Sequence, residues 1–330
     1  MADTITTFQE LANLWYEQHT YGLSYSYQRD LLCKITHLIN YLGELELSEI
    51  KPYHIDGVIV ALAKYNPSTK KPTSKKTLME IAHTARRIFE FAVDNDFVTK
   101  NPARNAINAV PKNAPKKYVP SITQKEQQLV LNTKHRCQLP AMIMMLTGLR
   151  VSELLALEWT DVDLVNKSMY IHQHAVKVAA NRFEVKPGTK NNKCRYVSIP
   201  DNLMEILVTS KKLSNSCFVF PKTNGDLNTP SSWKSAWESY INTVNWIYAD
   251  CPGSKFDPKG YPKQIKIHPH QLRHTYATML HHAGIDVKTA SKLMGHSSVQ
   301  ITLDIYTHLD NANKAIDISK LNHYLSHITA

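Results

Sequence analysis

The sequence predicts a mainly α-helical protein with a small antiparallel β-sheet, an α+β fold divided into two domains. Apolar residues recur at helical spacing through residues 7–100 and again beyond residue 123, whereas the alternation typical of strands is confined to about residues 169–200. A stretch rich in proline and asparagine, residues 101–121, separates the two helical parts. The chain has 330 residues, of which 43% are hydrophobic, so it can form two cores.

Four amphipathic helices are expected in the first part. They span residues 7–18, 26–43, 52–65 and 74–95. In the second of them Leu31, Ile35 and Leu38 share one face. Ser74 has the side chain of an N-cap, and Gly43 is suited to end a helix. These features predict a small all-helical domain.

The second part is expected to begin with helices over residues 123–158. A β-hairpin follows, with strands at residues 169–178 and 182–187 that turn near Ala180 and Asn181, and residues 194–200 supply a third strand. Helices resume over residues 201–248, and residues 248–265 are expected to form a surface insertion.

Three further helices are expected from about residue 270 to residue 308. Gly284 and Gly295 should end helices, while Asp286 and either Ser297 or Ser298 should begin them. The whole pattern gives four segments: a helical domain at 1–110, a linker at 111–121, a second domain at 122–310 and a C-terminal helix at 311–330.

Composition restricts the class of protein. The formal net charge is +11, and residues 1–115 carry 13 Lys and Arg against 12 Asp and Glu, so ten of the eleven excess charges lie beyond residue 115. Such an excess favours a polyanionic partner. The five cysteines are scattered and form no CxxC pair, which argues against a disulfide framework or a zinc site. No apolar run reaches membrane-spanning length and no signal peptide is recognisable, so a soluble, cytoplasmic protein is expected.

Basic residues also cluster in the first part and in the linker. They are either solvated or in contact with DNA, and the pattern leaves both readings open. The DNA-binding candidates are Lys70, Lys71, Lys75, Lys76, Arg86, Arg87, Lys116 and Lys117.

The segment HPHQLRHTYATMLHHAG places His270 and Arg273 three residues apart, on one face of a helix. A cation beside an imidazole suits an anion. His270 and His274 have the spacing of a zinc-binding helix, but position 271 is Gln where a metalloprotease needs a general base, and no third ligand is identifiable. We therefore predict no metal.

Two further segments carry candidate residues. In TGLRVSELLALEW, Gly148 should end one helix and Arg150 should lie in the first turn of the next, where backbone N–H groups already favour an anion. A surface ion pair of Arg150 with Glu153 is the alternative. In SKLMGHSSVQITLDIYTHLD, His296 lies in a Gly-His turn and Tyr306 follows ten residues later.

These segments, with TKNNKCRYVSIP, resemble the tyrosine recombinases of the phage integrase family in their order and spacing. The resemblance covers essentially the whole chain. It implies a helical core-binding domain and a catalytic domain that together clamp DNA. The small N-terminal arm-binding domain that many members carry is not recognisable in this sequence, which leaves open whether the protein has one. By position it implies catalytic roles for Arg150, Lys190, His270, Arg273, His296 and Tyr306, with Glu153 as a supporting carboxylate. Lys186 and Lys193 are alternatives to Lys190 in the same hairpin.

The resemblance implies that Tyr306 attacks a DNA phosphate and forms a 3′-phosphotyrosine, with no cofactor. The implied partners are double-stranded recombination sites, three further copies of the chain in a tetramer, and an accessory excision factor. A mobile element or phage genome would be integrated or excised, and a Xer-like resolvase or a type IB topoisomerase is the alternative. An apolar stripe at Ile318, Leu321, Leu325 and Ile328 predicts a C-terminal helix that docks on a neighbouring subunit or on its own domain.

Overall fold

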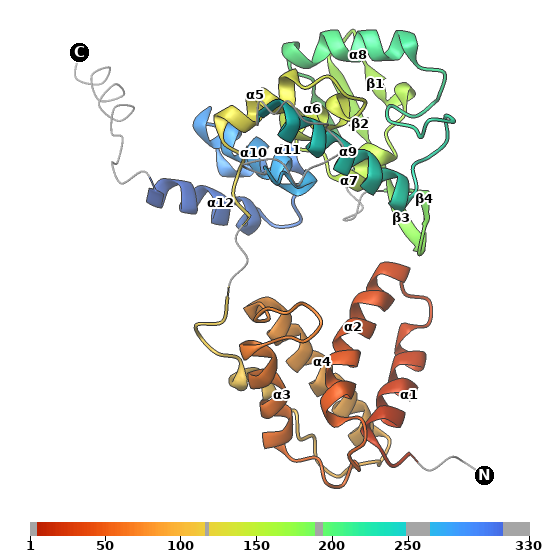
Figure 1. Cartoon of the computed structure of the whole chain (residues 1–330), viewed down its shortest axis with the longest axis vertical. Helices are drawn as coiled ribbons and strands as arrows, with labels where there is room; N and C mark the ends of the chain where they lie inside the picture. The colour runs from red at the N-terminus through yellow and green to blue at the C-terminus, as the bar shows by residue number, and fades with distance from the viewer. Residues whose placement is uncertain (1–4, 116–118, 189–193, 249–264, 313–330) are drawn as a thin grey trace. The chain divides into compact units, whose positions relative to one another are not determined.

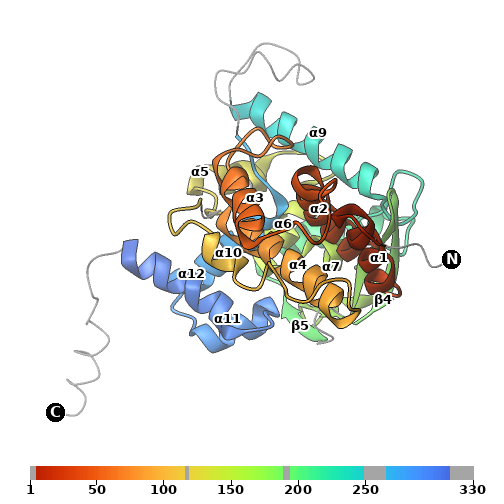
Figure 2. The same ribbon diagram turned by 90° about the horizontal axis from the view of Figure 1, so that it is seen from below.

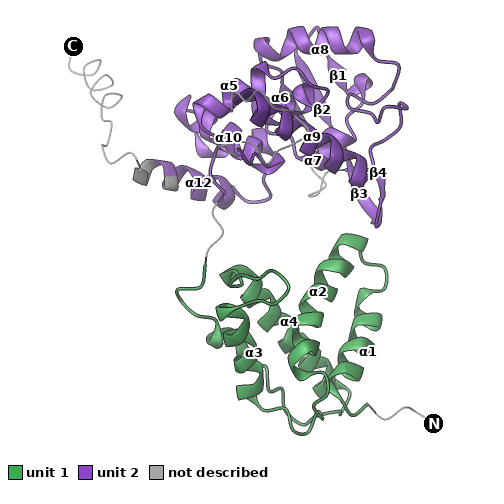
Figure 3. Ribbon diagram, in the orientation of Figure 1, with its two compact units in different colours: residues 1–118 green, residues 119–330 purple. Residues whose placement is uncertain are grey.

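The computed structural model of the chain describes residues 5–115, 119–188, 194–248 and 265–312, with the side chains of residues 308 and 310–312 excepted. The chain forms two compact units, Met1–Tyr118 and Val119–Ala330 (Figure 3). The predicted fold class is confirmed. Helices dominate both units, and the strands of the described residues all lie in the second (Figure 1).

The first unit is built on four helices. They are α1 (Phe8–Thr20), α2 (Tyr25–Leu42), α3 (Pro52–Lys64) and α4 (Lys75–Asp94), followed by the short 3-10 helix η1 (Ala106–Ala109). Thr7 caps α1 in a capping box with Glu10, and Ser74 caps α4 as predicted. The apolar face of each helix turns inward, and Leu38, Ile59 and Phe89 are among the fully buried core residues.

The proline-rich stretch that follows α4 contributes to the first core. Ala103, Ala106 and Ala114 are buried in it, and the Lys75 backbone N–H donates to the carbonyl of Pro115. These small side chains allow the backbone to approach the helices closely. Residues 101–115 thus pack on the first unit, although their composition alone is that of a linker.

The second unit begins with three helices and then turns to strands. The helices are α5 (Gln124–Asn132), α6 (Gln138–Thr147) and α7 (Val151–Leu155), and a 3-10 helix η2 (Trp159–Asp161) leads into the sheets. Every residue of α6 from Leu139 to Thr147 is buried, so α6 is the centre of the second core. A helix that is apolar on all sides must be covered on all sides.

Among the described residues, five short strands form two antiparallel sheets. β1 (Val162–Asp163), β2 (Ser168–Ile171) and β5 (Arg195–Ser198) form one in the order β1-β2-β5, and β3 (Gln173–Ala179) with β4 (Arg182–Pro187) forms the other. The hairpin turn at Ala180 and Asn181 is confirmed, because Ala179 pairs with Arg182.

The prediction of a single strand over residues 169–178 is wrong. The chain divides at His172 into β2 and β3, and β5 pairs with β2 and not with the hairpin. His172 contacts Asp161 through its ring at 2.9 Å, and its carbonyl accepts from the Gly188 N–H. The polar residues His172, Gln173 and His174 interrupt the alternation here, but so short an interruption does not by itself reveal a change of partner.

Five helices follow in the described part of the second unit. They are α8 (Asp201–Leu213), α9 (Pro230–Tyr248), α10 (Pro269–His282), α11 (Val287–Met294) and α12 (Val299–Ala312). Asp286 caps α11, and Gly295 ends it with a φ of +62°, as predicted. Helices α10, α11 and α12 lie together at one end of the unit (Figures 1 and 2), where α11 also approaches β5.

Candidate active site

Arg150 lies at the N-cap of α7, one position before the helical turn in which the sequence placed it. Its backbone N–H and its Nη1 donate to the two oxygens of Glu153, at 3.0 and 2.8 Å. Its Nη2 donates to the carbonyl of Gly295 at 2.6 Å. The ion pair with Glu153 that a surface arginine would make is therefore present, but it lies inside the second unit and connects α7 to the end of α11.

Glu153 is fully buried and is also held by a second arginine. Arg195 on β5 donates from Nη1 and Nη2 to the two carboxylate oxygens, at 3.0 and 2.8 Å. Burial by itself would raise the pKa of Glu153, but the hydrogen bonds and charge of Arg195, together with Arg150, lower it to about 2. The carboxylate is therefore ionised at neutral pH and fixed from two sides.

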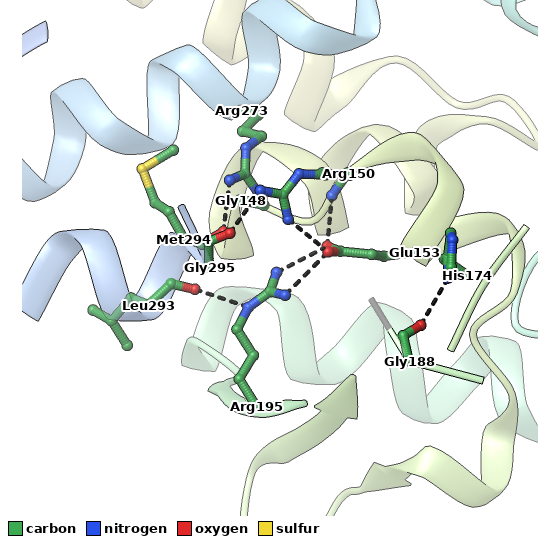
Figure 4. Close-up of polar contacts among 10 residues, drawn as sticks. All are labelled: Gly148, Arg150, Glu153, His174, Gly188, Arg195, Arg273, Leu293, Met294 and Gly295. Carbon is green, nitrogen blue, oxygen red and sulfur yellow. Dashed lines mark hydrogen bonds and ion pairs between the residues drawn. The ribbon is translucent and has the colours of Figure 1, made fainter. Parts of the chain in front are cut away.

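Three consecutive carbonyls at the end of α11 each accept a hydrogen bond from a different arginine. Arg195 Nε donates to Leu293 at 3.2 Å, Arg273 Nη2 donates to Met294 at 2.6 Å, and Arg150 donates to Gly295. Figure 4 shows the three guanidinium groups converging on this point, with Arg150 and Arg195 also reaching Glu153. The last carbonyls of a helix have no partner within the helix and carry partial negative charge, so arginines satisfy them well.

Arg273 is the most buried of the three arginines, with 3% of its surface exposed. Its Nη1 also donates to the carbonyl of Gly148, which ends α6 in the left-handed conformation with a φ of +68°. Burial and the charge of Arg150 lower the pKa of Arg273 to about 9, so it remains a cation at neutral pH. A buried cation repelled by a second cation favours an anion beside both.

Three histidines surround the arginines and are neutral at pH 7. Burial and the charges of Arg273 and Arg150 lower the pKa of His270, and the same causes lower that of His296 to about 3. Burial, His270 and Arg273 lower the pKa of His274 to about 4. The three histidines therefore contribute nothing to the net charge of the site. Three guanidinium groups against the one carboxylate of Glu153 leave a net charge of +2 on these residues.

His296 and His270 are each held by a neighbour. The Nδ1 of His296 lies 2.7 Å from the hydroxyl of Thr302 on α12, and its backbone N–H donates to Ser291. The ring of His274 meets that of His270 edge to face, with 5.0 Å between centroids. Both rings are thus oriented by contacts within the second unit.

Tyr306 lies on α12 and is buried, with 6% of its surface exposed. Its hydroxyl donates to the carbonyl of Ile285 at 3.1 Å, and its ring packs edge to face against His281. Burial and the charge of Asp286 raise its pKa to about 12. In this structure the hydroxyl is therefore engaged with the loop between α10 and α11 and not with the arginines.

Some predicted residues lie outside the described residues. These are Lys190 and its alternative Lys193, Lys116 and Lys117, residues 249–264 of the expected surface insertion, and residues 313–330 of the expected C-terminal helix.

The remaining basic candidates lie in the first unit and differ in their contacts. Lys76 has 88% of its side chain exposed, whereas Lys75 reaches the carbonyl of Lys112. Arg86 pairs with Glu90 at 2.7 Å on the surface of α4. Arg87 is directed toward other residues of the first unit. It contacts His19, donates a hydrogen bond to the Tyr27 hydroxyl at 3.3 Å and lies over the Trp15 ring. Lys70 and Lys71 belong to the turn between α3 and α4.

Arg195 belongs to the cluster around Glu153, although the sequence patterns did not indicate it. It stands in CRYVSIP, a segment noted only for its strand pattern, and nothing local marks it as a partner of Glu153, 42 positions away. The Arg195 guanidinium also approaches Gly295 closely. A Cβ built on Gly295 would lie 2.8 Å from Arg195 Nη1, so glycine allows the close approach as well as the left-handed turn.

In the part of the chain that the structure describes, no group of three or more His, Cys, Asp or Glu side chains is arranged to hold a metal ion. Nor does any helix among the described residues have the length and apolar character needed to cross a membrane.

Residues 115–313, more than half of the chain, match the phage integrase family. The chain belongs to the phage integrase family. As a member of this family of tyrosine recombinases, it is an enzyme that cuts and rejoins DNA through a covalent tyrosine intermediate.

Two relatives illustrate the match. A tyrosine recombinase XerC-like protein of Caldanaerobacter subterraneus is 28% identical over 315 residues, which are 87% of this chain and 75% of the relative. The ICEBs1 integrase of Bacillus subtilis is 28% identical over 253 residues, 72% of this chain and 62% of the relative.

Solved structures share the fold. The Tn1549 transposon integrase, solved in complex with a circular intermediate DNA, superposes with a TM-score of 0.71 at 19% identity and covers 90% of this chain and 94% of its own. A lambda integrase tetramer bound to a Holliday junction gives a TM-score of 0.60 at 17% identity, with 90% and 79% covered.

Proposed function

We propose that this recombinase uses Tyr306 as its nucleophile and the arginine cluster as its phosphate site, and that it integrates and excises a mobile element or phage genome. The observation that carries the proposal is the convergence of Arg150 and Arg273, from two different helices, in a cluster with a net charge of +2. A DNA phosphodiester carries one negative charge and gains more in the transition state of its cleavage, so this cluster suits the transition state better than the ground state.

Arg150 and Arg273 would hold the two non-bridging oxygens of the phosphate. A guanidinium has five N–H donors, and the protein contacts described above use two on each residue. The donors that remain can bind a phosphate without loss of the bonds that hold the arginines in place. Arginine suits this role because its planar donors match two oxygens at once.

Proton transfer must accompany both the attack and the departure. His270 is neutral at pH 7, so it could accept the proton of Tyr306. His296 is neutral as well. If the hydroxyl of Thr302 donates to Nδ1, the ring proton lies on Nε2, from which it could be donated to a phosphate oxygen. Lys190, Lys186 or Lys193 would protonate the departing 5′-oxygen; we assign that role to Lys190.

Tyr306 would form the 3′-phosphotyrosine. Its phosphorus–oxygen bond forms as the bond to the 5′-oxygen breaks, and a 5′-hydroxyl of another strand later reverses the step. Because the phosphodiester is conserved, neither ATP nor a nucleotide cofactor is needed. In the structure the hydroxyl of Tyr306 donates to Ile285, so attack requires exchange of that hydrogen bond for one to the phosphate or the base.

The partners would be double-stranded recombination sites and, during synapsis, three further copies of the chain. The names of its relatives and structural neighbours, among them an integrase of a transposon and a lambda integrase tetramer, support a mobile element and a tetramer. Residues 311–330 would join the subunits, Lys76 and the other exposed basic residues of unit 1 would bind the DNA backbone, and an accessory factor would direct excision. The reaction would take place in the bacterial cytoplasm.

The two alternatives predict different products. The XerC-like relative favours a resolvase as the second candidate, which would act on paired sites within one replicon. A type IB topoisomerase would relax plasmid without any recognition site. We would incubate the protein, with and without EDTA, with plasmids that carry two, one or no copies of the junction of the encoding element. Recombinants from the two-site plasmid together with joining of separate one-site plasmids, both unaffected by EDTA, support the proposal, whereas recombination confined to the two-site plasmid favours the resolvase. Relaxation of the plasmid without sites, or loss of activity in EDTA, would overturn it.

A further inference from the structure

Arg195 makes three polar contacts with the described residues, and each is directed at a neighbour of a proposed catalytic residue. Two reach the carboxylate of Glu153, which itself binds Arg150 through both its backbone and its guanidinium. The third reaches the carbonyl of Leu293, three positions before His296. Arg195 therefore connects β5 to α7 and to the end of α11 (Figure 4).

We propose that Arg195 is a positioning residue of the active site, which directs Arg150 toward the phosphate by sharing the Glu153 carboxylate and holds the Gly295–His296 turn through Leu293. The proposal rests on the proposed function, because it takes Arg150 and His296 as groups that act on DNA. It adds a residue that makes no contact with the substrate itself.

The contacts of Arg195 distinguish it from the two proposed phosphate ligands. All three of its guanidinium nitrogens donate to protein oxygens, whereas the contacts described above use two nitrogens each on Arg150 and Arg273. Its side chain is also 10% exposed, against 20% for that of Arg150. A planar guanidinium can span two carboxylate oxygens and a carbonyl together. The ammonium of a lysine has neither the width nor the fixed directions for this, so lysine should not replace Arg195.

Loss of Arg195 would remove one of the two cations that compensate the charge of the Glu153 carboxylate. The buried carboxylate would then have Arg150 as its one cationic partner in the cluster, and it would compete with the phosphate for that guanidinium. Removal of the carboxylate charge in the same protein should therefore relieve part of the defect. A residue that only fills space would show no such dependence on the charge of Glu153.

The test is a set of four variants in the full chain: Arg195→Met, Arg195→Lys, Glu153→Gln and the double variant Arg195→Met/Glu153→Gln. A matched control set, Arg182→Met with and without Glu184→Gln, alters an exposed arginine–glutamate pair on β4, with side chains 69% and 39% exposed. The rate of covalent adduct formation on a nicked DNA substrate and the affinity for that DNA are measured separately.

Arg195→Met and Arg195→Lys should each slow adduct formation by roughly 10- to 100-fold, the loss typical of residues that orient a reactive group. DNA affinity should stay within about twofold, because a buried and internally paired arginine neutralises no phosphate. The double variant should react faster than Arg195→Met alone, and the Arg182 set should react like the parent. Full activity of Arg195→Met, or a double variant no faster than Arg195→Met, would overturn the proposal.

A second measurement needs no DNA activity. Without Arg195 the burial of Glu153 should raise its pKa, so the thermal midpoint of Arg195→Met should lie below that of the double variant at pH 7.5 and approach it at pH 5 as Glu153 takes up a proton. Equal midpoints at both pH values would contradict the proposed contact. If the parent forms no adduct, the proposed function fails, while this comparison still decides whether Arg195 stabilises the Glu153 carboxylate.

Discussion

Arg150, at the start of α7, donates a 2.6 Å hydrogen bond to the carbonyl of Gly295, 145 positions later in the chain. The bond joins the element that carries the first arginine to the turn that carries His296. Arg273 and Arg195 donate to the two preceding carbonyls. Because the carbonyls at the end of α11 accept hydrogen bonds from all three arginines, a substitution at any one arginine should alter the positions of the other two.

Glu153→Gln should destabilise the second unit. The substitution removes the charge that compensates Arg150 and Arg195 in a buried position, and breaking such a pair costs about 3–5 kcal/mol. Urea unfolding at pH 7.5 measures the loss. The exposed counterpart Glu184→Gln should cost below about 1 kcal/mol.

The difference in the free energy of unfolding between the parent and Glu153→Gln should also depend on pH. The pKa of Glu153 is lowered to about 2, below its ordinary value of 4.5, so its stabilisation is complete above pH 4.5 and is lost as the pH falls toward 2. Unfolding followed between pH 6 and pH 3 should show the gap narrowing at the acid end. A gap that stays constant would mean that the carboxylate charge does not stabilise the fold.

Gly148→Ala should be more harmful than an alanine at another left-handed glycine. At Gly148 a Cβ would overlap the ring of Tyr276, and the carbonyl of the same residue accepts from Arg273. At Gly225, which has a φ of +90°, the nearest atom to a Cβ would be the Cβ of Ser216 at 4.0 Å, an ordinary contact, so Gly225→Ala measures the cost of the backbone conformation, about 1–2 kcal/mol. Thermal unfolding of both variants should show the larger loss for Gly148→Ala, together with slower DNA cleavage. Equal losses would argue against the packing on Tyr276.

Acid should weaken the second unit through His274 and His296. Their pKa values are lowered to about 4 and about 3, whereas in the unfolded chain they titrate near 6.5. The unfolded state therefore gains protons first, and stability should fall as the pH drops below 6.5 and continue to fall toward pH 4. His274→Gln should show a shallower decline of the unfolding midpoint between pH 7.5 and pH 5. His282, which is exposed, offers the control His282→Gln, which should decline like the parent.

In the first unit, Lys76 and Arg87 should respond in opposite ways. Lys76 is exposed, and so Lys76→Ala should weaken DNA binding and reduce the slope of log affinity against log salt by about 0.9 for one lost phosphate contact. Arg87 contacts His19 and Trp15, so Arg87→Ala should chiefly lower the stability of the first unit. Fluorescence anisotropy over a range of salt concentrations, with thermal unfolding of the same proteins, separates the two effects. An unchanged salt slope for Lys76→Ala would remove it from the DNA-contacting set.

Much of the fold could be predicted from local patterns, because helix periodicity, caps such as Ser74 and Asp286, and the left-handed turn at Gly295 are all properties of neighbouring residues. The ordered motifs also indicated Arg150, Arg273 and the histidines as one set. What local patterns could not show were contacts between distant positions. The bond of Arg195 to Glu153, the division of the strand at His172 and the contact of Tyr306 with Ile285 all depend on where other elements pack.

The most direct test of the account is covalent capture. The full chain and Tyr306→Phe are incubated with a nicked substrate that carries the junction of the encoding element, and the products are separated on a denaturing gel. The phenylalanine variant loses one hydrogen bond, to Ile285, worth about 1 kcal/mol, so it should fold and bind DNA. We predict a protein–DNA adduct with the parent and none with Tyr306→Phe. An adduct that persists in Tyr306→Phe, or hydrolysed DNA from both proteins, would contradict the central claim that Tyr306 is the nucleophile.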